Sequence, residues 1–300
     1  MPKKVEYTFT YITFVISRTN NTAIYQIIIL PKVMKKLGLF FLFLSILIVA
    51  VAATPYLDIK SHQLGYERVK TAYAEKEQLV KASLLAKGIS SESYQLYLRA
   101  FKNEGVLEAW VKPNGKDQFQ LFKTYDICQV SGALGPKEKQ GDFQTPEGFY
   151  YIDRFNPKSN FYLSLGIDYP NTADRRRSDA QNLGGDIFIH GSCETVGCLP
   201  MNNDQIKEIY VLSVEASDHG QAQIPVHIFP YRINNKIYDD SIFETPKKLN
   251  EEERELIKFR RNLGEGMIMF DRTRTLPSIT VDQDGKYQFS QDAGGNFAKL

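Results

Sequence analysis

A run of 17 residues without a charged side chain, Leu37 to Ala53, is the feature that most limits how this chain can fold. Lys35 and Lys36 precede the run, and the small-residue stretch Ala50-Val51-Ala52 lies near its end. Its length lies between a signal-peptide core and a full membrane span. The flanking lysines predict that the following residues are translocated. We interpret residues 34–53 as an export signal, either cleaved or retained as a membrane anchor; a buried core helix is the weaker alternative.

Residues 1–33 are unusual in front of such a signal, which normally begins at the initiator methionine. Here an apolar stretch with few turn residues precedes Met34-Lys35-Lys36, which has the character of a true start. We expect residues 1–33 to be an upstream extension that results from a mis-assigned start. Removing residues 1–53 leaves 300 − 53 = 247 residues, a length that suits one domain with additions.

The composition is that of a globular protein, with 43% apolar and 24% charged residues. The 37 basic and 35 acidic side chains give a net charge of only +2, without a basic block. Binding to nucleic acid is therefore not expected. Three cysteines are too few for a disulfide scaffold, and because their number is odd, at least one thiol is left over.

Helical patterns come first in the exported part. Residues 66–87 are rich in Ala, Lys, Glu and Leu and stop at Gly88, which predicts a helix. Ser90 and Ser91 have the pattern of an amino-terminal cap and predict a second short helix to about Asn103. We expect the exported part to divide into a helical segment, a main domain and a carboxy-terminal extension, at residues 54–104, 105–231 and 232–300.

Short strand-like runs follow Gly105. Pro113-Asn114-Gly115 is a turn signal between two such runs and predicts a hairpin of residues 106–111 and 119–127. Glycine, proline and asparagine separate four further expected strands, at residues 148–152, 161–165, 186–190 and 226–229. Periodic stretches predict two helices, one capped by Asn202 and ending near Ser217 and one at residues 250–262, and a last strand is expected at residues 278–281. The pattern indicates a mostly β domain with α additions.

The segment Asp186 to Asn203 carries the clearest chemical signal. His190 ends a strand that looks buried, and Cys198 follows eight residues later, before the capped helix. A nearby imidazole and the positive potential at a helix start both favour a thiolate. Gly197 allows close backbone approach, so amide groups in this region could stabilise an oxyanion. A nucleophile, a base and an oxyanion region predict acyl transfer, with Cys198 as nucleophile and His190 as general base.

Three other interpretations of these residues remain open. His190, Cys193 and Cys198 could be metal ligands, although the pattern lacks a fourth ligand. Cys193 and Cys198 could form a disulfide in an oxidising compartment, which would leave Cys128 unpaired and block the nucleophile. His190 could also be a core histidine at a strand end. Spacing alone does not choose among them; we expect no metal and no cofactor.

The same segment resembles the active-site signature of the L,D-transpeptidase catalytic domain (YkuD-like) family, in its murein L,D-transpeptidase-like branch. The branch pattern HG-x-C-x-[ST]-x-GC-x-x-M matches His190-Gly191, Thr195, Gly197-Cys198 and Met201. Further likeness lies in residues 127–152, with their Thr145-Pro146-Glu147-Gly148 turn, and in the stretch that ends at Arg232. The resemblance covers roughly residues 105–285. It implies an L,D-transpeptidase-like β-sandwich or barrel, preceded here by the short helical segment.

The resemblance implies a substrate and a mechanism as well. Cys198 matches the family's nucleophile and His190 its general base, and the substrate would be a peptidoglycan stem tetrapeptide that contains diaminopimelate. The thiolate would attack the carbonyl of the third stem residue, release the terminal D-alanine and leave an acyl-enzyme. Attack by an amine of another stem would give a 3-3 cross-link, attack by a D-amino acid an exchange, and attack by water hydrolysis. The implied location is the periplasm or the outer face of the inner membrane.

The sequence departs from the wider family at two places. Typical members have a histidine and an arginine where this chain has Val196 and Pro200, and the loop from His190 to Cys198 is shorter than usual. These departures make a hydrolase of the same bond class plausible, including an amidase that detaches wall-bound protein. An inactive peptidoglycan-binding module is the rival from another class. The run Arg175-Arg176-Arg177 could pair with substrate carboxylates, but a solvated loop is the simpler interpretation.

Overall fold

The computed structural model describes residues 4–9, 12–19, 22–29, 58–233 and 249–291, and it divides the chain into two compact units, Met1–Leu57 and Asp58–Leu300. In the first unit, three antiparallel strands pair in sequence order: β1 (Lys4–Phe9), β2 (Ile12–Thr19) and β3 (Thr22–Ile29). The expected export segment at residues 34–53 lies outside the described residues. Among the helices of the described part, none is long and apolar enough to cross a membrane.

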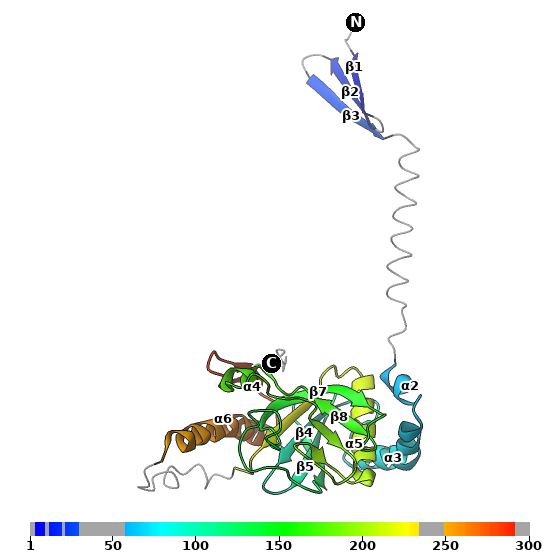
Figure 1. Cartoon of the computed structure of the whole chain (residues 1–300). Helices are drawn as coiled ribbons and strands as arrows, with labels where there is room; N and C mark the ends of the chain where they lie inside the picture. Colours follow the sequence, from blue (N-terminus) through cyan, green and yellow to red (C-terminus); the bar gives the residue numbers. More distant parts are fainter. Residues whose placement is uncertain (1–3, 10–11, 20–21, 30–57, 234–248, 292–300) are drawn as a thin grey trace. The chain divides into compact units, whose positions relative to one another are not determined.

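An eight-stranded mixed sheet forms the centre of the second unit (Figure 1). Its strand order is β10-β9-β8-β7-β11-β4-β5-β6. In chain order the strands are β4 (Tyr94–Phe101), β5 (Val106–Pro113), β6 (Gln120–Asp126), β7 (Gly148–Asn156), β8 (Ser164–Ile167), β9 (Phe188–His190), β10 (Leu199–Pro200) and β11 (Pro225–Phe229). The predicted hairpin of β5 and β6 is confirmed by their antiparallel pairing. The mostly β fold with helical additions is confirmed too.

Helices on the amino-terminal side agree only in part with the prediction. A short helix α2 (Ile59–Gln63) precedes α3 (Glu67–Ala86), which confirms the helix expected at residues 66–87. The second helix, expected from Ser90 to about Asn103, is wrong, because the chain forms strand β4 there. Tyr94 to Phe101 is rich in residues that favour strands, and parallel pairing with β11 and antiparallel pairing with β5 outweigh the local cap signal.

Helix α5 (Asn203–Asp218) follows the predicted site segment directly. Asn202 and Gln205 form a capping box at its start, which confirms the cap expected from the sequence. The buried face of α5, with Ile206, Ile209 and Leu212, belongs to the same core as α3 and the sheet. This packing fixes the start of α5 and therefore the chain that leads into it.

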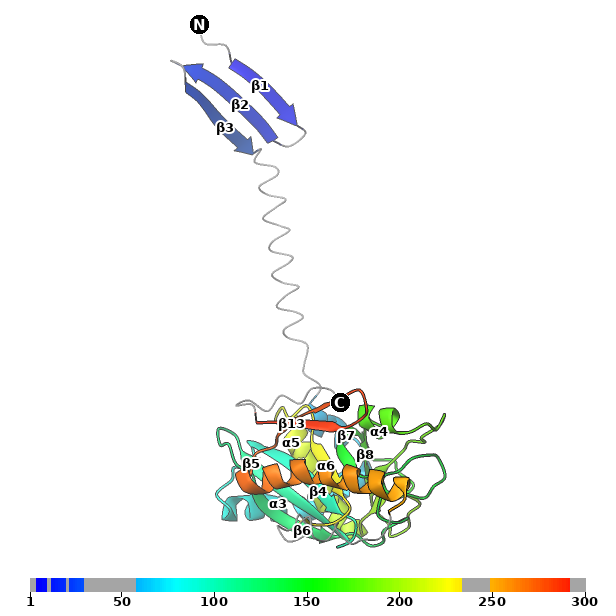
Figure 2. The same ribbon diagram turned by 90° about the vertical axis from the view of Figure 1, so that its left-hand side faces the viewer.

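The carboxy-terminal extension covers the opposite face of the sheet. Its helix α6 (Glu251–Thr273) is longer than the predicted 250–262, and it crosses in front of β4 and β5 in Figure 2. Antiparallel strands β12 (Ser278–Val281) and β13 (Tyr287–Ser290) follow it. The arginine run is not a loop but the end of a short helix, α4 (Thr172–Arg177). Arg176 donates to the Val281 and Asp282 carbonyls, so this helix holds the extension.

Candidate active site

The two predicted catalytic residues lie on neighbouring strands. His190 is the last residue of β9, and Cys198 comes immediately before β10. The two strands are parallel, with Leu199 opposite Ile189 and Pro200 opposite His190. One residue before this register, Cys198 lies near Phe188, whose amide acts on its thiol, two residues before His190 along β9. Ile189 and Leu199 point into the aliphatic core.

The imidazole of His190 is held in one orientation. The side chain is buried, and its Nδ1 lies 2.6 Å from the Gly191 carbonyl oxygen. Since a carbonyl only accepts, Nδ1 carries the proton in the neutral ring, and Nε2 is left with a lone pair. The ring of Phe161 packs against the imidazole with centroids 4.7 Å apart. Burial lowers the pKa of His190, so the neutral form is present at pH 7.

Cys198 is the free cysteine of the chain, and its side chain is half-buried. The thiol donates to the Asp186 carbonyl oxygen, with Sγ 3.7 Å from it. Burial raises the pKa of the Cys198 thiol, and the charge of Asp186 adds to this, while the Phe188 amide and Lys137 oppose it. Burial therefore opposes the thiolate that the sequence favours, and a thiol that keeps its proton at rest must lose it as it attacks.

Gly197 lies where only glycine fits. Its φ is +126°, and a Cβ added there would lie 2.9 Å from the Gln144 carbonyl oxygen. Its amide donates to Thr195 Oγ1 at 3.2 Å, so this N–H is already engaged. The Thr195 hydroxyl in turn donates to the Cys198 carbonyl at 2.9 Å. Gly197 thus shapes the turn before the nucleophile, and its role in an oxyanion region stays a prediction.

A disulfide ties the loop between the two catalytic candidates to the end of β6. Cys193 pairs with Cys128, 65 residues earlier in the chain. The alternative of a Cys193–Cys198 disulfide is therefore wrong, and the alternative metal set loses Cys193 as a ligand. Among the residues that the structure describes, no group of three or more His, Cys, Asp or Glu side chains could hold a metal ion. On the other side of Cys193, the Ser192 amide donates to Asn203 Oδ1 at 3.0 Å.

A buried ion pair holds the turn that contacts Cys198. This pair was not identified from the sequence. Lys102 and Glu147 are fully buried, with Nζ 2.9 Å from Oε1. The Lys102 ammonium also donates to the carbonyls of Gly135 and Thr145, at 3.0 and 2.9 Å, and the Gly135 amide donates to Glu147. Thr145 contacts the Cys198 carbonyl through its hydroxyl at 3.5 Å. Glu147 belongs to the Thr145–Gly148 turn, which was identified from the sequence, but no sequence pattern around Lys102 indicates its role.

Comparison with known proteins gives a consistent family assignment. The model of the YkuD L,D-transpeptidase catalytic domain matches residues 95–228. A protein named "Putative L,D-transpeptidase YafK" from Escherichia coli (strain K12) is 35% identical over 198 residues, 65% of this chain and 74% of that protein. Its namesake from Escherichia coli O157:H7 matches with the same figures.

Two solved structures have weaker similarity to this chain. The helical cell shape determining protein Pgp2 of Campylobacter jejuni is 17% identical, with a TM-score of 0.37, over 64% of this chain and 74% of that one. Bd1075 of Bdellovibrio bacteriovorus is 19% identical, with a TM-score of 0.34, over 57% of each chain.

Proposed function

Because the chain belongs to the L,D-transpeptidase catalytic domain family, we propose that it is an exported cysteine acyltransferase acting on peptidoglycan stem peptides. The observation that carries the proposal is the pairing of β9 with β10. This pairing supports the proposal because it brings the chain of a free thiol, Cys198, next to the strand that ends at a buried imidazole whose Nδ1 is already engaged. Nucleophilic acyl transfer requires a nucleophile, a base and a group that orients the base; here these are Cys198, His190 and the Gly191 carbonyl.

The first half of the reaction forms a thioester. Nε2 of His190 takes the Cys198 proton as Sγ attacks the carbonyl carbon of the third stem residue, a diaminopimelate. The tetrahedral intermediate collapses, the bond to D-alanine breaks, and His190⁺ returns the proton to the departing amine. Free D-alanine and a Cys198 acyl-enzyme result. The raised pKa of the thiol and the lowered pKa of His190 fit this concerted transfer better than a preformed ion pair.

The second half depends on the acceptor. The amine of another stem gives a 3-3 cross-link, a D-amino acid gives exchange, and water gives a tripeptide; His190 removes the acceptor's proton in each case. A side chain near the nucleophile is exposed and apolar, and this supports hydrolysis as the second candidate, because water needs no binding site for an acceptor amine. Val196, at a position where typical members have histidine, is 72% exposed, so it offers a bound acceptor amine no polar contact.

Mass spectrometry of the full chain in detergent, incubated with a diaminopimelate-containing disaccharide-tetrapeptide, tests the proposal. We expect release of D-alanine and an acylated Cys198, and a loss of at least about a thousandfold in Cys198→Ala and His190→Ala. The matched control is His62→Ala, because His62 is an exposed histidine on α2.

Each product identifies a different activity. A cross-linked dimer indicates a transpeptidase, and a tripeptide without dimer indicates a hydrolase. The absence of both product and acylated protein would contradict the proposal. It would favour an amidase that needs a wall-linked protein as substrate, or an inactive peptidoglycan-binding module.

The Cys128–Cys193 disulfide supports an extracytoplasmic location, because disulfides persist in oxidising compartments. We propose the periplasm or the outer face of the inner membrane, with residues 34–53 as signal or anchor and residues 1–33 as an upstream extension. The proposed catalytic domain ends near residue 231. We propose Tyr94 as its start in place of the expected residue 105, because β4 is an inner strand of the sheet.

A further inference from the structure

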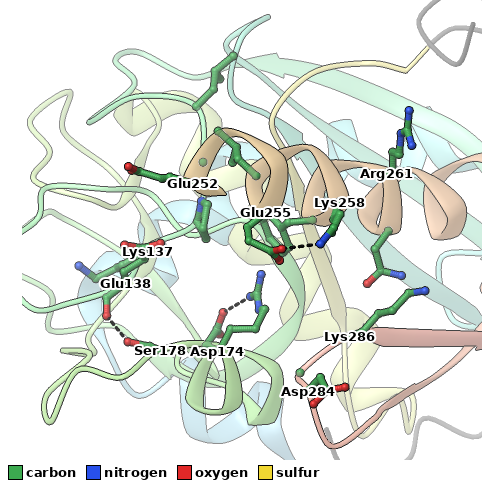
Figure 3. Close-up of a pocket in the computed structure, with 18 of the residues that line it drawn as sticks. Lys137, Glu138, Asp174, Ser178, Glu252, Glu255, Lys258, Arg261, Asp284 and Lys286 are labelled. Atoms are coloured by element: carbon green, nitrogen blue, oxygen red, sulfur yellow. Dashed lines mark hydrogen bonds and ion pairs between the residues drawn. The ribbon is translucent and has the colours of Figure 1, made fainter. Parts of the chain in front are cut away.

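A charged pocket lies between the sheet domain and the carboxy-terminal extension (Figure 3). Its volume is about 730 Å³, which is enough for a short peptide. One wall is the loop around residues 134–138 with α4, and the other is α6 with the turn at residues 284–286. The second wall lies outside residues 95–228, the part that the family model matches. The pocket therefore forms only where the carboxy-terminal extension meets the matched domain.

The pocket wall continues into the loop that supports the nucleophile. Gln144 lines the pocket, and its carbonyl oxygen is so close to Gly197 that a Cβ added there would lie only 2.9 Å from it. Lys137 lines it as well, and its charge acts on the Cys198 thiol. A group bound in this pocket would consequently lie against the same loop that positions Cys198.

Acidic and basic side chains are unevenly distributed around the pocket. Figure 3 shows Glu138 and Glu252 on one side, with Lys137, and Lys258, Arg261 and Lys286 on the other. Lys137 pairs with Asp142, so its charge is already compensated. Among the described residues, neither Glu138 nor Glu252 has a cation within ion-pair distance, so both carboxylates can receive an amine.

A lysine on the cationic side can leave its present ion pair and bind a ligand at a small cost in free energy. Lys258 pairs with Glu255, but both side chains are more than half exposed, and such a pair is weak. Asp284 lies below Lys286 on this side and reduces its positive potential.

We infer that this pocket binds a second peptidoglycan stem peptide, with an amine on the Glu138–Glu252 side and a carboxylate on the side of Lys258 and Lys286. The inference rests on the proposed function, since it takes the substrate class from there. Diaminopimelate carries both an amine and a carboxylate on one residue, and the stem's D-glutamate adds a further carboxylate. A ligand with only one sign of charge would satisfy one side and face repulsion or desolvation at the other.

Calorimetry with the tripeptide L-alanyl-γ-D-glutamyl-diaminopimelate tests this site in the full chain in detergent. The tripeptide lacks the terminal D-alanine and so cannot acylate Cys198 through that bond. We expect Glu138→Gln with Glu252→Gln to weaken its binding about tenfold, and Lys258→Gln with Lys286→Gln to do the same. Asp284→Asn should strengthen binding. Lys70→Gln, an exposed lysine on α3, is the matched control and should leave binding unchanged.

A second probe separates this pocket from the catalytic site. Acetylation of the diaminopimelate amine should weaken binding to the unaltered protein. The Glu138→Gln, Glu252→Gln variant and the unaltered protein should then bind the acetylated tripeptide with the same affinity. Equal tripeptide affinity in all variants, or no tripeptide binding at all, would overturn the inference. Acylation of Cys198 by tetrapeptide is measured in parallel, and it reports on the proposed function independently of either calorimetric result.

Discussion

The two faces of the sheet in the second unit are held by different chemistry. Strand β4 contributes Leu96 and Leu98 to an aliphatic core under α3 and α5, while Tyr97 and Phe101 point to aromatic clusters under α6. The aromatic face also buries Arg99, which pairs with Glu108 and Asp271. The first face has ion pairs too, Lys60–Glu215 and Lys123–Glu208, but their lysines reach solvent, whereas Arg99 and Glu108 are both buried.

This difference predicts which face loses stability when a charged side chain is removed or the pH changes. The leucine, isoleucine and valine side chains of the first core tolerate volume-conserving substitutions and do not titrate, so the cost of truncating one of them should not depend on pH. A buried charge network fails when one partner is removed, because the remaining charge is left uncompensated. The extension that carries the pocket wall is attached through the second kind of face. Neighbouring residues of β4 offer a direct comparison.

The largest effect is expected for Arg99→Met. Its guanidinium lies 5.0 to 5.2 Å from the rings of Phe101, Trp110 and Phe270 and bonds Glu108 at 2.5 Å. Removing it leaves Glu108 buried with reduced compensation, at an expected cost of about 3–5 kcal/mol in the free energy of unfolding. Urea denaturation measures this, with Arg99→Lys as the conservative control, expected to lose less. A loss below about 1 kcal/mol would mean that the aromatic face does not depend on the pair.

The adjacent residue tests the other face. Leu98 is fully buried in the aliphatic core, and Leu98→Ala should cost about 3 kcal/mol through lost burial and a cavity. Unlike the loss in Arg99→Met, this loss should be the same at pH 5 and at pH 8, with Leu98→Met as the mild control. A clear pH dependence of the Leu98→Ala effect would break the distinction between the faces.

Acid should weaken the aromatic face through His227. This side chain is buried against Tyr97, whose hydroxyl lies 2.9 Å from Nδ1, and burial lowers its pKa to about 3. A folded-state pKa below the unfolded value of about 6.5 means that the neutral ring's stability is complete above pH 6.5. It is lost as the pH falls toward 3, by about 2 kcal/mol between pH 6.5 and 5.

Chemical denaturation from pH 8 to pH 4 measures this acid dependence. His227→Gln should remove the His227 share of the slope, whereas His62→Gln, at an exposed histidine, should not change it. Identical slopes in the unaltered protein and His227→Gln would show that this histidine is not a source of the acid sensitivity.

Much of the aliphatic face could be predicted from sequence, because periodicity reports burial. The α3 and α5 patterns and the β5–β6 hairpin were recognised in this way. The β4 strand was not, since its identity depends on pairing with β11, about 125 residues later, while its local cap signal favours a helix. The path of α6 across the sheet and the arginine helix α4 likewise depend on tertiary contacts.

For the candidate site, the sequence suggests which residues to consider but not how they are arranged. His190 and Cys198 stand in a segment whose residue types indicate nucleophilic catalysis, and the β9–β10 pairing brings the two parts of this segment together. Cys193 gave no sign that its partner is Cys128, because disulfide connectivity depends on distance in space. The burial that raises the pKa of the thiol could not be predicted either, since helix-dipole and imidazole arguments do not include it.

The smallest effect concerns that thiol, which lies outside the charge network of the aromatic face. The charge of Asp186 contributes to the raised pKa of Cys198, so Asp186→Asn should lower this pKa slightly. The rate of Cys198 alkylation by iodoacetamide would then reach half its maximum at a lower pH. Asp153→Asn is the matched control, because Asp153 and Asp186 both pair with Arg154. An equal shift in both variants would point to the freed Arg154, and a rate already constant at pH 6 would indicate a thiolate–imidazolium pair.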